Sequence, residues 1–201
     1  MEYKQLIKKI EESLFWLDAN ARHAIELKET FSFPAYDESI RKLIEGTNKV
    51  HCYKVCLDAI YFEFIMTLMR MYDSFEHDTV CFKKLFEYLT DDFIQHYEKD
   101  TASEVRNKIE SALKEYRDLN GSHFVGRLKT VRHNMFAHTS TNFNRNQVAE
   151  YGHAEKLFDK TLPMLNKLNY AFRDKLEPYD KISTFWKGYA KEFWRDLIKN
   201  S

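Results

Sequence analysis

The chain has 201 residues, and its 31 Lys and Arg balance its 31 Asp and Glu, so its formal net charge at pH 7 is zero. This length suits one domain or two small ones around a sizeable core, and the neutral balance excludes a strongly basic, general binder of polyanions. Five Gly and three Pro are too few for a turn-rich β-sandwich or a disordered chain, which favours an all-α fold.

Short apolar runs and an odd number of cysteines indicate the compartment and the redox state that we expect for this protein. A membrane-spanning helix needs about 18 consecutive apolar residues, and charged side chains interrupt every apolar run before that length. The first residues mix charges with apolar side chains, unlike a secretory signal. Three cysteines are an odd number for a disulfide framework. We therefore expect a cytoplasmic protein with reduced thiols and no membrane contact.

Hydrophobic periodicity predicts helices throughout the chain. They cover residues 3–29, 37–45, 48–74, 79–89, 91–119 with an interruption near 100, 122–138, 147–174 and 179–199. The first helix should end near Pro34, because the residue before a proline is disfavoured in the α region. The third is apolar on nearly every side, which is typical of a buried helix. We expect one compact domain, with an N-terminal helical extension over 1–47 and a helical bundle over 48–201.

Charge is distributed unevenly along this neutral chain. Residues 1–100 hold 13 basic and 19 acidic side chains, whereas residues 101–201 hold 18 basic and 12 acidic ones. Residues 119–149 contain no Asp or Glu, although four basic side chains and three histidines lie there. This stretch is the best candidate for an anion site, and the alternative is a solvated polar surface that simply lacks acids.

Within the acid-free stretch, Arg132 and His138 are separated by five residues near the end of an apolar helix. Spacing alone does not single them out. Pairs with four to six intervening residues are Arg70/His77, Arg117/His123, Arg127/His133 and Arg132/His138. The last pair is favoured by the apolar helix before it, by the small Ala137 and by the missing acids. On an ideal helix, Asn134 shares a face with His138.

The segment 131–138 resembles the motif of HEPN domains, in which Arg, four to six residues and His lie near the end of a core helix. The Ala137-His138 ending is similar to an abortive-infection, AbiU-like branch. In that branch an earlier buried helix carries an Arg and an Asp, matched here by Arg70 and Asp73. The resemblance covers roughly residues 48–175 and implies an all-α HEPN-like bundle.

The resemblance implies a metal-independent endoribonuclease, without a cofactor, of the toxin-antitoxin or phage-defence type. Arg132 would hold the scissile phosphate and His138 would transfer protons, because imidazole titrates near neutral pH. His133, Asn134, Arg127, Arg70 and Asp73 are the candidate supporting or substrate-binding residues. Implied partners are RNA, a second copy of the chain with the motif at the dimer cleft, and an antitoxin protein.

Several other interpretations stay open. The chain could be a non-catalytic helical module that binds a nucleotide, RNA or protein, and His138 could serve only the structure. Arg70 and Asp73, three residues apart, are expected to form a structural ion pair. Cys52 and Cys56 are expected to be buried thiols, with a metal site as the alternative. A C-terminal stripe is expected to pack on the domain, with a partner surface as the alternative; it consists of Trp186, Ala190, Phe193, Trp194 and Leu197.

Overall fold

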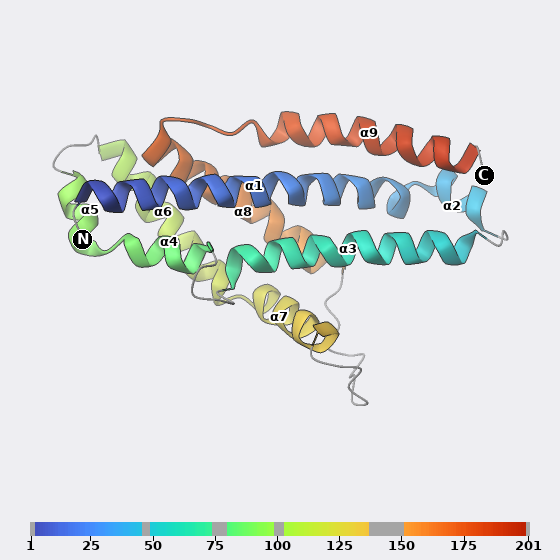
Figure 1. Ribbon diagram of the computed structural model, residues 1–201, viewed down its shortest axis with the longest axis horizontal. Helices are drawn as coiled ribbons and strands as arrows, with labels where there is room; N and C mark the ends of the chain where they lie inside the picture. The colour runs from blue at the N-terminus through green and yellow to red at the C-terminus, as the bar shows by residue number, and fades with distance from the viewer. Residues whose placement is uncertain (1–2, 46–48, 74–79, 99–102, 137–150, 200–201) are drawn as a thin grey trace. The chain divides into compact units, whose positions relative to one another are not determined.

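The computed structural model describes residues 3–45, 49–73, 80–98, 103–136 and 151–199, with the backbone only at 98, 133–136, 151 and 199. These residues form nine helices and no strand, which confirms the all-α prediction (Figure 1). The helices are α1 (Tyr3–Tyr36), α2 (Glu38–Ile44), α3 (Val50–Tyr72), α4 (Phe82–Tyr88), α5 (Asp91–Glu98), α6 (Ser103–Asn120), α7 (His123–Phe136), α8 (Tyr151–Arg173) and α9 (Tyr179–Lys199).

The helices pack as two compact units. Unit 1 consists of Met1–Ala21 and Leu68–Glu177, and unit 2 consists of Arg22–Thr67 and Pro178–Ser201. Helices α1 and α3 therefore contribute to both units. The predicted division of the chain at residue 47 describes a different grouping and remains a prediction.

The core of unit 1 is rich in aromatic rings from several helices. The phenol of Tyr72, at the end of α3, lies 5.2 Å from the ring of Phe82 on α4 and 6.4 Å from the ring of Tyr116 on α6, centroid to centroid. Phe86 stacks on Tyr116 at 4.3 Å. Burial raises the pKa of the Tyr116 phenol to about 12, and burial also raises the pKa of Tyr72 well above its ordinary value.

A buried carboxylate ties α1 to α8 within unit 1. Asp18 accepts a hydrogen bond from Asn169 Nδ2 at 2.7 Å and forms an ion pair with Arg173. The Asp18 side chain is only 6% exposed, so both partners offset the cost of removing its charge from water. The first half of α1 is therefore fixed to the end of α8.

In unit 2, side chains from two helices complete the hydrogen bonding around Pro34. A proline has no N–H, so the carbonyl of Thr30 cannot receive the usual helical bond from position 34. Trp194 Nε1 on α9 donates to that carbonyl at 2.9 Å, and the Tyr53 hydroxyl on α3 donates to the Pro34 carbonyl at 2.6 Å. Helix α1 consequently continues two residues beyond Pro34, to Tyr36, close to the predicted end.

Burial along α3 differs from the expectation for a helix that is apolar all round. Most residues of its second part, from Tyr61 onward, are buried, whereas Val55 is 68% exposed and both Cys52 and Cys56 are exposed. The prediction of buried thiols was therefore wrong. In this first part, the hydroxyl of Tyr53 contacts α1 and the cysteines lie on another side of the helix.

The C-terminal stripe divides into a buried and an exposed set. Ala190 and Trp194 are buried, which confirms packing for these two residues. Phe193 and Leu197 are exposed and continue a row, spaced by four, that begins with Phe185 and Tyr189. The apolar surface of α9 therefore extends beyond the face that packs on the core.

Candidate functional site

The candidate motif lies on α7, which packs against α8 in unit 1. The helix forms because Val125, Leu128 and Val131 recur every three residues and are buried on one face. Ser122 directly precedes the helix, and its hydroxyl donates back to the Leu119 carbonyl. Its own backbone carbonyl accepts the first helical bond, from Gly126 N at 3.3 Å.

Arg132 lies at the edge of the buried face of α7 and forms an ion pair with Asp73. Its Nη1 contacts Oδ2 of Asp73, the residue that directly follows α3. The Arg132 side chain is 17% exposed and that of Asp73 is 26% exposed, so the pair lies at the boundary between core and solvent. A guanidinium has five N–H donors in one plane, and a carboxylate at one of them fixes the orientation of that plane.

Tyr72 holds the end of α3 in place beside this pair. Its hydroxyl lies 2.7 Å from Thr161 Oγ1 on α8, and Thr161 Oγ1 in turn lies 2.7 Å from the Leu157 carbonyl. Because a carbonyl can only accept, the Thr161 hydroxyl donates to Leu157 and the Tyr72 hydroxyl donates to Thr161. Asp73 itself keeps a helical bond from its N–H to the Met69 carbonyl, at 2.9 Å. The carboxylate is therefore presented from an anchored helix end.

The structure brings together only some of the predicted site residues. Asp73 meets Arg132 across 59 positions of sequence. Asp73 thus pairs with Arg132 on α7, and the predicted ion pair between Asp73 and Arg70 was wrong. Arg70 and Arg127 are exposed, the first in the last turn of α3 and the second in the middle of α7.

Three predicted site residues cannot be placed by the structure. His138 lies outside the described residues, and the side chains of His133 and Asn134 are likewise not described. The backbone of α7 extends to Phe136, two residues before His138. The predicted roles of these three residues stay predictions.

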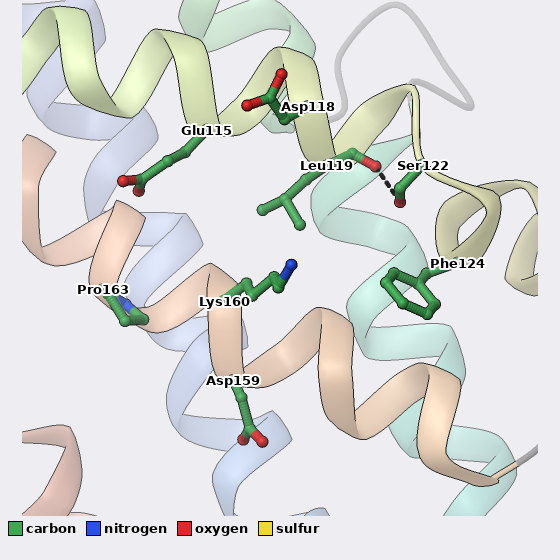
Figure 2. Close-up of a pocket in the computed structure, with 8 residues that line it drawn as sticks. All are labelled: Glu115, Asp118, Leu119, Ser122, Phe124, Asp159, Lys160 and Pro163. Atoms are coloured by element: carbon green, nitrogen blue, oxygen red, sulfur yellow. Dashed lines mark hydrogen bonds between the residues drawn. The ribbon is translucent and has the colours of Figure 1, made fainter.

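Sequence reasoning missed a pocket beside the first turn of α7. The pocket has a volume of about 390 Å³ and lies where the end of α6, the start of α7 and the middle of α8 meet (Figure 2). Leu119, Phe124 and Pro163 provide apolar walls, and four charged side chains also line it. The charged residues are Glu115, Asp118, Asp159 and Lys160. No sequence motif marks it, because its residues come from three helices.

A second unpredicted cluster surrounds Phe124. The ring of His153, buried near the start of α8, lies 5.5 Å from the Phe124 ring and edge-on to His123 at 5.6 Å. Lys156 Nζ lies 6.0 Å from the same phenylalanine ring. These contacts join the first turns of α7 and α8, and neither His153 nor Lys156 had been noted from the sequence.

The described residues contain neither a candidate membrane span nor a candidate metal-binding group. None of the helices in this part of the chain is long and apolar enough to cross a membrane. Among the same residues, no group of three or more His, Cys, Asp or Glu side chains could hold a metal ion.

Comparison with known proteins identifies the family. The family model described as HEPN, AbiU2, matches residues 2–193. The chain belongs to the HEPN AbiU2 family. It contains a HEPN domain, and the family match also covers residues 2–47, which lie outside the stretch of the motif resemblance. No curated protein and no solved structure matches.

Proposed function

We propose that this HEPN domain is a metal-independent endoribonuclease, with Arg132 and His138 as its catalytic residues. The observation that supports the proposal best is the Arg132–Asp73 ion pair. It orients a permanently charged guanidinium at the boundary between core and solvent, six positions before a histidine. A guanidinium held in this way suits the binding of a phosphate and the stabilisation of charge that develops on it.

In the proposed reaction the ribose 2′-oxygen attacks the adjacent phosphorus and the bond from phosphorus to the 5′-oxygen breaks. His138 accepts the proton of the 2′-hydroxyl or delivers a proton to the leaving 5′-oxygen. The products are a 2′,3′-cyclic phosphate and a 5′-hydroxyl. DNA is not cleaved, because it has no 2′-hydroxyl.

A second copy of the chain would complete the proposed site. One histidine cannot accept and donate a proton at the same moment, so a dimer that places two motifs in one cleft supplies a base and an acid. We further propose that an antitoxin protein restrains this activity in cells. The negative first half of the chain leaves the proposed RNA contacts to the second half.

The test is cleavage of an end-labelled, structured RNA in excess EDTA by the full chain. Arg132→Ala and His138→Ala should each reduce the rate at least about 100-fold, and wild-type products should end in cyclic phosphates. The matched controls Arg195→Ala and His23→Ala, exposed and remote in sequence from the motif, should cleave like wild type. Equal cleavage by all variants would refute the proposal.

A non-catalytic binding module is the second candidate, and the same ion pair favours it. Arg132 already has a carboxylate partner and is mostly buried, as expected for a residue that positions other groups. This candidate predicts no cleavage by the wild type under any of these conditions, together with RNA binding that Arg132→Ala weakens. A gel-shift titration with the same RNA separates the two candidates.

A further inference from the structure

We infer that the pocket between α6, α7 and α8 binds a guanine base of the RNA substrate. The inference rests on the proposed function, because it assigns the pocket to a nucleotide near the cleaved bond. Two side chains on different walls give the pocket its specificity. Asp118 is on α6 and Lys160 is on α8, and Figure 2 shows the Lys160 chain extending from α8 toward α6.

Asp118 and Lys160 are available to a ligand. Neither side chain makes a hydrogen bond or an ion pair with another residue in the part of the chain that the structure describes. Glu115, by contrast, is engaged by Lys167 through an ion pair and by the Ser111 hydroxyl at 3.4 Å. The pocket therefore offers one side chain that only accepts hydrogen bonds and one that only donates them.

The charge of the lining indicates which part of a nucleotide enters. Three of the four charged side chains that line the pocket are acidic, and this predominance of carboxylates disfavours a phosphate there. A neutral base is not repelled, and its faces can contact the apolar walls formed by Leu119, Phe124 and Pro163. The volume of about 390 Å³ lies at the small end of the range for ligand sites.

Among the four RNA bases, guanine matches the two charged groups best. Its Watson–Crick edge presents two neighbouring donors, N1–H and the N2 amino group, which a carboxylate accepts together. Its O6 and N7 are acceptors that an ammonium recognises. Adenine, cytosine and uracil each lack the pair of adjacent donors. We therefore assign Asp118 to the donors of guanine and Lys160 to its acceptors.

The pocket lies within reach of the proposed cleavage site along one helix. Phe124 and Arg132 are eight residues apart on α7, which corresponds to about 12 Å along the axis and roughly 80° around it. An RNA strand that places one phosphate at Arg132 can thus place a base a few nucleotides away in the pocket. Guanine at one fixed distance from the cleaved bond is the expected sequence preference.

The first test measures binding without cleavage, by titrating the full chain with guanosine, adenosine, cytidine and uridine and following ligand-observed NMR. Nucleosides carry no phosphate, so Arg132 does not influence the result. Guanosine should bind at least about tenfold more tightly than the other three. Asp118→Asn and Lys160→Met should each weaken guanosine binding about tenfold, whereas the controls Asp180→Asn and Lys191→Met on α9 should not change it.

Equal affinities for the four nucleosides, undetectable guanosine binding, or binding unchanged in both pocket variants would each overturn the inference. The second test maps cleavage in a library of RNAs with wild type and Asp118→Asn. Loss of a guanine preference in the variant supports the inference. Cleavage without guanosine binding refutes the pocket assignment alone, and guanosine binding without cleavage refutes the proposed ribonuclease alone.

Discussion

The guanidinium of Arg132, on α7, forms an ion pair with the carboxylate of Asp73, which follows the last turn of α3. The pair fixes the candidate catalytic arginine to the end of a helix that is distant from α7 in sequence. The contribution of this ion pair to stability and its effect on RNA cleavage can be measured separately.

A double-mutant cycle measures that value. Asp73→Ala and Arg132→Ala should each lower the free energy of unfolding by about 1–2 kcal/mol, between the values typical of exposed and buried ion pairs. The double variant should lose about 1 kcal/mol less than the sum, because neither charge is then left without its partner. Urea unfolding followed by circular dichroism provides the free energies.

The rate of RNA cleavage by an Asp73 variant tests whether this ion pair also orients Arg132. Asp73→Asn should lower kcat for RNA cleavage about tenfold with a smaller change in KM, since the arginine is still present but less well oriented. An unchanged kcat in Asp73→Asn would limit Asp73 to a structural role. Glu110→Gln, which breaks an exposed ion pair with Arg106 on α6, is the matched control.

The buried hydrogen bond between Tyr72 and Thr161 predicts unequal costs for removing its two partners. Tyr72→Phe should cost about 1 kcal/mol, because Thr161 retains its bond to the Leu157 carbonyl. Thr161→Val should cost about 2 kcal/mol or more, because it leaves the buried Tyr72 hydroxyl without an acceptor. Equal costs in thermal or urea unfolding would contradict the assigned donor directions.

Tyr116 predicts a loss of stability at alkaline pH. Burial raises the pKa of its phenol to about 12 in the folded protein, against an ordinary value of 10. The stabilisation is complete below pH 10, where the phenol is protonated in both states. It is lost as the pH rises from about 10 toward 12, because the unfolded state releases the proton first.

Urea unfolding of wild type and Tyr116→Phe between about pH 8 and pH 11.5 checks this sign. The variant should lose less stability than wild type over the upper part of the range. Phe86→Leu, which removes the ring stacked on Tyr116, should lower stability at every pH and make the alkaline loss smaller than in wild type, because the phenol is then less buried. A steeper alkaline loss in Tyr116→Phe would contradict the prediction.

Substitutions at Pro34 and Trp194 should have non-additive effects on the free energy of unfolding. Trp194→Phe removes the donor to the Thr30 carbonyl and should cost about 2 kcal/mol, from the lost hydrogen bond and the smaller ring. In a Pro34→Ala background this cost should fall by about 1 kcal/mol, because alanine supplies the helical N–H that proline lacks. Additive costs in unfolding experiments would refute this account, and Phe193→Ala, at an exposed position, is the control for α9.

Helices and their order could be predicted from local patterns, whereas the contacts of the candidate site could not. For example, α9 was expected over its observed range, residues 179–199. Asp73, however, was assigned to Arg70 because the two lie three residues apart. Its partner on α7 depends on how α3 and α7 are packed, which no local spacing records.

The errors within helices also have physical causes. Trp194 and Phe193 are adjacent and both apolar, but they lie about 100° apart around α9, so one is buried and the other exposed. The exposed first part of α3 has an apolar sequence, and its composition had indicated burial. Helix α1 was expected to end near Pro34 because the residue before a proline is disfavoured in the α region. It continues to Tyr36, and the side chains that donate to the carbonyls of Thr30 and Pro34 come from α9 and α3, which are distant in sequence.

Each unit is built from two segments of the chain that are separated in sequence, and this order affects folding during translation. The chain enters unit 1, passes to unit 2 within α1, returns within α3 and enters unit 2 again at Pro178. The buried Trp194 side chain, which completes the hydrogen bonding at Thr30, is therefore translated 164 residues after its acceptor. During synthesis the apolar faces of α1 and α3 in unit 2 emerge long before α9 does, so this half of the fold closes only after translation of the segment 178–199. A nascent chain stalled before that point would expose those faces to chaperones and proteases.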